Sequence, residues 1–133
     1  MSEITVKATL EYIDNVTAFV NSELEAADCS MKSQLQIDVA IDELFSNICY
    51  YAYGDGEGSA TVSVEIDGGM AVIRFIDSGV PYDPLKREDP DTTLSAEERK
   101  IGGLGIYMVK KSMDKLEYEY RDGKNILTLH KKI

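Results

Sequence analysis

The sequence predicts a two-layer α/β (α+β) sandwich, in which about three helices cover one face of a mixed, mostly antiparallel sheet. Residues 36–53 carry apolar side chains at the spacing of one long helix with a wide buried stripe. Two pairs of short alternating segments, 61–66 with 71–76 and 116–120 with 126–132, flank glycine-containing turn signals of β-hairpins. Neighbouring hairpins favour antiparallel pairing, and helices with one apolar stripe favour packing on a sheet.

The other elements follow from the same periodicities. Residues 4–10 alternate as a strand, and residues 11–27 form an amphipathic helix with one apolar side. Ser30 is a suitable N-cap for the long helix, and Gly54 ends that helix in a glycine-rich turn. A last helix is expected over residues 106–114.

Residues 80–100 differ from the rest of the chain. They hold all three prolines and a charge-rich run, KREDPDTTLSAEERK, and we interpret them as a loop with a helical turn near residues 94–99. Loops of this length in compact domains are usually functional lids or disordered segments. No internal repeat or linker interrupts the chain, so residues 1–133 are expected to form a single domain.

Composition and charge narrow the range of functions. The formal charge of −10 argues against nucleic acid and anionic membranes as partners. An acidic protein can bind a nucleotide only with local help from a divalent cation, a helix N-terminus or placed Lys and Arg. No apolar run approaches the roughly 20 residues that span a bilayer, and no signal pattern opens the chain. A cytoplasmic protein is therefore expected, with Cys29 and Cys49 as reduced thiols.

Glu43 and Asn47 lie one helical turn apart on the rim of the long apolar stripe, with Asn47 nearer the core. A carboxylate at such a rim can take a proton or orient a nucleophile, and a carboxamide oxygen can coordinate a hard cation. The same pair also fits a solvated polar helix face, because this spacing of Glu and Asn is common.

The Asp-Ser-Gly motif at residues 77–79 ends a strand. A buried carboxylate at Asp77 can accept a hydrogen bond from an exocyclic amine such as that of adenine, and Gly79 permits a flat ring to approach closely. The motif fits an ordinary turn as well. Thr128, in the last strand, can hold Asp77 or a water, or is simply a strand threonine. His130 is interpreted as a surface residue without a role.

A glycine cluster opens the last helix. Gly102, Gly103 and Gly105 expose backbone N–H groups where the helix N-terminus favours a phosphate. Arg99 and Lys100, just before the cluster, are able to reach phosphate oxygens. The alternatives are a flexible hinge for the glycines and solvated charges for the two basic residues.

The order of these motifs resembles the GHKL superfamily of ATPases, over nearly the whole chain. Residues 43–47, ELFSN, are similar to the family's N box, and residues 77–81, DSGVP, to its D-x-G-x-P box. Residues 101–109, IGGLGIYMV, are similar to the G-x-G box, and DGKNILTLHKK to the last strand. The resemblance is nearest to the anti-sigma factor group of serine/threonine protein kinases. It implies a Bergerat ATP-binding fold with an ATP lid over about residues 80–102.

By this resemblance the cofactors are ATP and Mg²⁺. Asn47 would coordinate the Mg²⁺, Asp77 would take the adenine with Thr128 behind it, and Glu43 would be the catalytic base. The residues implied for ATP binding are Asn47, Asp77, Gly79, Lys100, Gly102, Gly103, Leu104, Gly105 and Thr128. The implied activity is phosphorylation of a serine on a STAS-domain anti-anti-sigma protein, which regulates a sigma factor. A homodimer is expected on the same ground.

Two departures from the family pattern favour an alternative function. Residues 11–27 contain neither Arg nor Lys, where relatives often have a basic residue for partner contact. Tyr50 and Tyr51 stand where relatives often have a histidine after the asparagine. The alternative is an ATP-gated regulatory binding module without significant kinase activity. A third hypothesis is a histidine-kinase catalytic domain cut from a longer chain, for which autophosphorylation of His130 would be the sign.

Overall fold

The computed structural model describes residues 2–54, 56–86 and 103–133 of the chain. Within these residues the chain forms five strands, three α-helices and two short 3-10 helices. The strands are β1 (Ser2–Lys7), β2 (Ser59–Asp67), β3 (Met70–Asp77), β4 (Lys115–Arg121) and β5 (Lys124–Lys132). The α-helices are α1 (Ile13–Ala26), α2 (Met31–Tyr51) and α3 (Gly103–Ser112), and the 3-10 helices are η1 (Leu10–Tyr12) and η2 (Pro84–Lys86).

The strands form one sheet in the order β1-β2-β3-β5-β4. Every described pairing is antiparallel, so this part of the chain contains none of the parallel pairing that a mixed sheet would allow. The hairpin β2–β3 turns at Gly68 and Gly69, and the hairpin β4–β5 turns at Asp122 and Gly123, all with positive φ. Positive φ at both central residues matches the right-handed twist of the flanking strands, which confirms the predicted hairpins.

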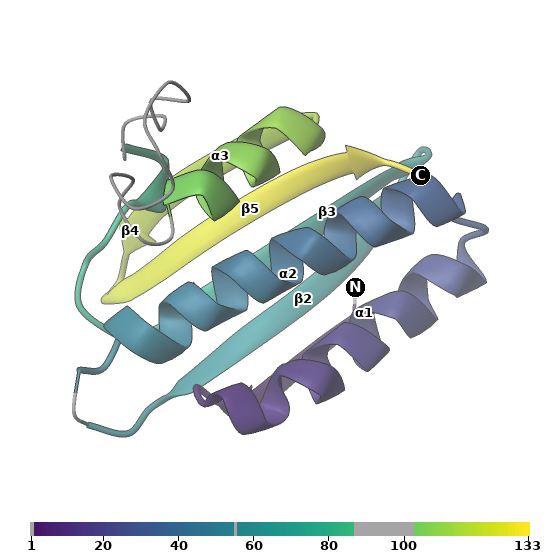
Figure 1. Ribbon diagram of the computed structural model, residues 1–133. Coiled ribbons are helices and arrows are strands. Elements are labelled where there is room, and N and C mark those ends of the chain that lie inside the picture. Colours follow the sequence, from purple (N-terminus) through teal and green to yellow (C-terminus); the bar gives the residue numbers. More distant parts are fainter. Residues whose placement is uncertain (1, 55, 87–102) are drawn as a thin grey trace.

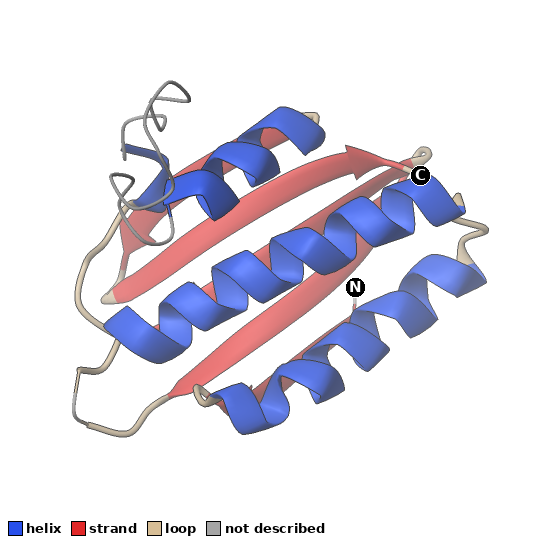
Figure 2. Cartoon of the chain, viewed as in Figure 1, coloured by secondary structure: helices blue, strands red, loops and turns tan. Residues whose placement is uncertain are grey.

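All three α-helices lie on one face of the sheet, with α2 between α1 and α3 (Figure 1). The colouring by secondary structure in Figure 2 shows the resulting two layers, which confirm the predicted sandwich. Apolar side chains of the helices and of the covered sheet face form the core between the layers. The largest fully buried side chains include Phe45, Phe75, Leu24, Ile37, Ile41, Ile73, Ile106 and Leu129.

The first strand and helix differ in their bounds from the sequence prediction. β1 runs from Ser2 to Lys7, because its pairing with β2 ends where Lys7 faces Ser59. The chain then makes η1 before α1 begins at Ile13. Alternation continues in the sequence beyond Lys7, but the partner strand does not, and a strand at the edge of a sheet needs that partner.

α2 begins and ends close to where its signals predicted. The Ser30 side chain caps the helix by accepting a hydrogen bond from Ser33 N at 3.2 Å. The helix ends at Tyr51, and Gly54 follows with a φ of 56°. α3 begins at Gly103, earlier than residue 106, so the glycine cluster contributes to its first turn.

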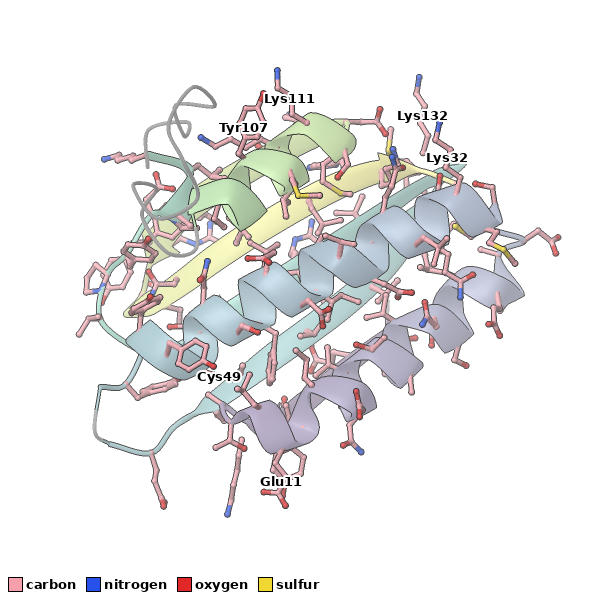
Figure 3. The ribbon with its side chains drawn as sticks, viewed as in Figure 1. Glu11, Lys32, Cys49, Tyr107, Lys111 and Lys132 are labelled. Atoms are coloured by element: carbon pink, nitrogen blue, oxygen red, sulfur yellow. The ribbon has the colours of Figure 1, made fainter. Side chains whose placement is uncertain are left out.

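The described part of the predicted lid, residues 80–86, contains η2. The helical turn expected near residues 94–99 lies outside the described residues. Cys29 and Cys49 are both free thiols, and burial raises the pKa of Cys49 (labelled in Figure 3) to about 11. None of the described helices combines the length and the apolar character needed to cross a bilayer.

Candidate functional site

A hollow opens where the C-terminal end of α2 meets the end of β3 and the start of β5. Its cavity volume is about 40 Å³, which is small beside the usual small-molecule site. Its walls are Leu44, Asn47, Ile48, Tyr51, Ala52, Phe75, Asp77, Val80, Tyr82, Pro84, Tyr118, Asn125 and Leu127. Most of these side chains are apolar or aromatic, and three are polar, which suits a flat ligand with a few directed hydrogen bonds.

Asp77 is the carboxylate of this hollow. It ends β3 and is only 7% exposed. Its Oδ1 accepts hydrogen bonds from Gly79 N and from Asn125 Nδ2, both at 2.9 Å. Its second oxygen, Oδ2, has no hydrogen-bond partner among the described residues. The carboxylate is therefore held by one oxygen while the other can accept from a ligand.

Three tyrosines from separate parts of the chain line the hollow. Tyr51 ends α2, Tyr82 follows β3, and Tyr118 lies in β4. The rings of Tyr51 and Tyr82 have centroids 6.2 Å apart and planes tilted by 41°. Burial raises the pKa of Tyr118, whose hydroxyl donates to Asn125 Oδ1. Aromatic walls of this kind favour a planar heterocycle through offset or edge contacts.

Asn47, in α2, places its amide at the same hollow. Its Nδ2 is buried without a hydrogen-bond partner among the described residues. A buried amide N–H without a partner costs free energy, so the site gains if a ligand supplies an acceptor there. The unpartnered N–H is thus a position at which a ligand with an acceptor atom would gain a hydrogen bond.

Gly79 has a packing role that the sequence did not reveal. A Cβ at this position would lie 2.1 Å from the carbonyl oxygen of Ala52, at the end of α2. The next residue, Val80, donates its N–H to the same oxygen at 2.8 Å. The close approach that Gly79 permits is therefore an approach to the backbone of α2, and its contact with a flat ring stays a prediction.

Tyr53 stabilises the turn that follows Asp77 through hydrogen bonds of its hydroxyl. Its hydroxyl donates to Ser59 O at 2.6 Å and accepts from Ser78 N at 2.8 Å. A Cβ on Gly58 would lie 2.3 Å from the Tyr53 ring, so the ring is closely packed there. This tyrosine joins the end of α2 to the start of β2 and to the turn after β3.

Glu43 faces α3 rather than the hollow. A Cβ at Gly105 would lie 1.9 Å from Glu43 Oε2, so the carboxylate rests directly on the first turn of α3. Burial raises the pKa of Glu43, and the charge of Asp42 raises it further. The fold thus brings together the predicted base and the glycine cluster, two motifs far apart in the sequence.

Three of the residues predicted for phosphate contact lie outside the part of the chain that the structure describes. Lys100 and Gly102 lie outside the described residues, as does Arg99. Gly103 begins α3, and Leu104 lies in its first turn. Their predicted roles stay predictions.

Thr128 does not lie behind Asp77, and this part of the sequence prediction is wrong. In the register of β3 with β5, Asp77 faces Asn125, whereas Thr128 faces Arg74. Side chains alternate along β5, so Leu127 and Leu129 enter the core and Thr128 points to the opposite face of the sheet. His130 also lies on that face, 2.8 Å from Glu117 Oε1 through its Nε2.

Asn125 is the site residue that the sequence prediction missed. It is 6% exposed and donates from Nδ2 to Asp77 Oδ1 and to Val80 O, both at 2.9 Å. The sequence held a signal for it: counting back by twos from Leu129 and Leu127 reaches Asn125 on the core face.

Comparison with known proteins agrees with this geometry. A model of the family "Histidine kinase-like ATPase domain" matches residues 6–131. The chain belongs to this family. The match spans every residue that lines the hollow.

Two relatives indicate the branch of the family. The serine/threonine-protein kinase BtrW of Bordetella bronchiseptica is 28% identical over 101 residues, which cover 75% of this chain and 71% of the relative. The serine-protein kinase RsbW of Listeria monocytogenes is 24% identical over 129 residues, which cover 93% of this chain and 82% of the relative. This chain is thus related to serine-protein kinases of the anti-sigma factor group.

A solved structure supports the fold. The histidine kinase AdeS of Acinetobacter baumannii superposes with a TM-score of 0.56 over 99% of this chain and 68% of the other, at 12% sequence identity. At this identity the likeness extends to the architecture of the ATPase domain alone.

Proposed function

We propose that this protein is a Mg-ATP-dependent serine/threonine protein kinase of the anti-sigma factor type. Its substrate would be a serine on a STAS-domain anti-anti-sigma protein, and the reaction would regulate a sigma factor. The observation that carries the proposal is the arrangement of Asp77: one oxygen is held by the protein and the other is available to a ligand, at the bottom of an aromatic hollow. Membership of an ATPase domain family and kinase-named relatives support it.

The nucleotide base fits the hollow by its chemistry. An exocyclic amine would donate to Asp77 Oδ2, and the planar ring would lie against Tyr51 and Tyr82. The phosphates would then extend toward Asn47 and the first turn of α3. Backbone N–H groups at a helix N-terminus favour phosphate, and the glycines there leave the backbone accessible.

Mg²⁺ would depend on the nucleotide for most of its ligands. Within the described residues no three His, Cys, Asp or Glu side chains converge as a metal site. The carboxamide oxygen of Asn47 is a suitable single ligand, and phosphate oxygens and water would supply the others. When bound, the ion would neutralise charge on the phosphates.

Glu43 would act on the partner's hydroxyl. In the proposed step the serine oxygen attacks the γ-phosphorus, Glu43 takes the hydroxyl proton, and the bond to the leaving ADP breaks. A raised pKa makes Glu43 a stronger base than an exposed glutamate, provided that it is ionised at neutral pH. Its contact with Gly105 places it beside the turn of α3 where we expect the phosphates.

The second candidate function is an ATP-gated binding module without significant kinase activity. Tyr51 favours it, because an aromatic wall of the base pocket stands where relatives often carry a histidine. In this function ATP binding would change a partner surface without phosphate transfer.

Calorimetric titration with ATP, with and without Mg²⁺, tests both functions. Micromolar binding that weakens sharply without Mg²⁺ is expected. Transfer of labelled phosphate to a serine-bearing STAS-domain protein by the unaltered protein, and not by Glu43→Ala, would then support the kinase. Equal ATP affinity with no transfer by either protein would favour the binding module. Absence of ATP binding under both conditions would refute both functions.

A further inference from the structure

Asn125 uses its whole hydrogen-bonding capacity inside the protein. Nδ2 donates to Asp77 Oδ1 and to Val80 O, both at 2.9 Å. Its Oδ1 accepts from Tyr82 N at 3.1 Å and from the Tyr118 hydroxyl. Two donors and two acceptor positions are the full complement of a carboxamide, so no part of Asn125 is left for a ligand.

These four partners determine which way the amide points. Asp77 and Val80 offer only oxygens to the Nδ2 side, and Tyr82 N can only donate to the Oδ1 side. The reversed amide would place its oxygen against two acceptors and its NH₂ group against a donor. In the low dielectric of a residue that is 6% exposed, such mismatches are costly.

Because the amide is fixed, the two oxygens of Asp77 differ: the protein occupies one and leaves the other to a ligand. Oδ1 accepts from Asn125 Nδ2 and from Gly79 N, which fills its two acceptor positions. Rotation of the carboxylate would break both bonds. Oδ2 is therefore the oxygen that remains at the hollow. As a carboxylate oxygen it accepts hydrogen bonds and donates none.

We propose that Asn125 is a positioning residue that reserves Oδ2 of Asp77 for an amine of the ligand and so sets the preference of the hollow for an amino purine. The inference rests on the proposed nucleotide site and deepens it. Without the amide of Asn125 the carboxylate can turn, and its oxygens no longer meet the amine at one defined position. The base pocket then keeps its aromatic walls but loses its means of distinguishing an amino purine from one without the amine.

Comparing the affinities for two ligands distinguishes the positioning role of Asn125 from a purely structural one. ATP carries the exocyclic amine, and purine riboside triphosphate lacks it while keeping the ring, ribose and phosphates. Asn125 also fastens the backbone at Val80 and Tyr82, so its removal lowers affinity for both ligands. Only the positioning role changes the ratio of the two affinities.

The experiment is calorimetric titration of both triphosphates, with Mg²⁺, into the unaltered protein, Asn125→Ala and Asn125→Leu. The unaltered protein is expected to prefer ATP by about tenfold or more, the effect of one hydrogen bond to a charged group. In Asn125→Ala the ratio is expected to fall to between about one and three. Asn15→Ala, at an exposed position of α1, is the matched control and should keep the full ratio.

Asn125→Leu keeps the volume of the side chain but can neither donate to Asp77 nor accept, so it tests the positioning role if the alanine variant does not fold. It is expected to lose the preference as well. An ATP preference retained within twofold in the folded variants would overturn the positioning role and leave the proposed function standing. An unaltered protein that binds neither triphosphate would overturn both.

Discussion

Glu43 and Gly105 share one small space: a Cβ on Gly105 would lie 1.9 Å from Oε2 and 2.1 Å from Cδ of Glu43. The three nearest atoms belong to the end of the flexible Glu43 side chain, which can move without disturbing the backbone. Gly105→Ala is therefore expected to displace the carboxylate and leave the fold intact. Alanine also favours a helix over glycine by about 1 kcal/mol, which offsets the loss of contact. We expect phosphotransfer to fall to the level of Glu43→Ala, with ATP affinity reduced less.

The double variant Glu43→Ala/Gly105→Ala is the control for this coupling. If alanine at Gly105 acts only by displacing Glu43, the double variant should transfer phosphate no more slowly than either single variant. Multiplied losses of rate, with unchanged folding by circular dichroism, would show that Gly105 acts on the phosphates independently of Glu43.

Gly79→Ala should behave in the opposite way, although the chemical change is the same. Its Cβ would lie 2.1 Å from Ala52 O and 2.5 Å from Ala52 C, and the backbone of a helix end cannot move cheaply. The shift would also break the hydrogen bond from Val80 N to Ala52 O. We expect a loss of about 3 kcal/mol in the free energy of unfolding, measured in urea. Gly105→Ala is the matched comparison, and an equal stability of the two variants would contradict the packing argument.

Much of this fold could be predicted from the sequence, because its apolar residues recur at the spacings of the helices and strands that they form. The apolar stripe of residues 36–53 identified α2, and Ser30 identified its start. Glycine-containing turns identified both hairpins. The end of β1 could not be predicted, because it depends on where the partner strand β2 ends, more than 50 residues away in the sequence.

The site was harder to predict, because it depends on register between strands. Asp77 and Asn47 both line the hollow, and their contacts with a nucleotide stay predictions. The partner of Asp77 was expected at Thr128, but the register of β3 with β5 sets Asn125 there. Tyr51, Tyr82 and Tyr118 come from separate parts of the chain, so only the fold shows that they line one hollow.

Thr128→Val should leave nucleotide binding unchanged. The hydroxyl points to the sheet face opposite the helices, where Thr128 stands between Arg74 of β3 and Glu117 of β4. Valine keeps the branched shape and the strand preference of threonine. We expect the Kd for ATP to stay within about twofold by calorimetry. A tenfold weakening would mean that Thr128 reaches the nucleotide after all, and that Asn125 does not replace it.

Tyr53→Phe should loosen the turn after Asp77 without removing any side chain of the hollow. The variant loses the bonds to Ser59 O and from Ser78 N, and it keeps the ring that packs on Gly58. We expect a loss of about 1–2 kcal/mol in stability and a measurable weakening of ATP binding. Tyr50→Phe, at a residue that is 61% exposed, is the control and should change neither.

The pKa of Glu43 predicts a pH-dependent cost in stability. Burial and the charge of Asp42 raise the pKa of Glu43 above its ordinary value of 4.5. Between that value and the raised pKa the folded state binds more protons than the unfolded state, so this group lowers stability as pH increases through the window. Above the window the cost is fully present, and below it the cost is absent.

In the variant Glu43→Gln the side chain cannot ionise, so the variant should not lose stability as pH increases through this window. We expect its Tm to exceed that of the unaltered protein by about 1–3 °C at neutral pH, a modest figure because solvent screens a half-exposed group. The difference should shrink as pH falls toward 4.5, the lower limit of the window. Glu11→Gln, at the exposed Glu11 labelled in Figure 3, is the control. A Tm difference that is the same at every pH would assign the effect to packing against Gly105, and not to the charge of Glu43.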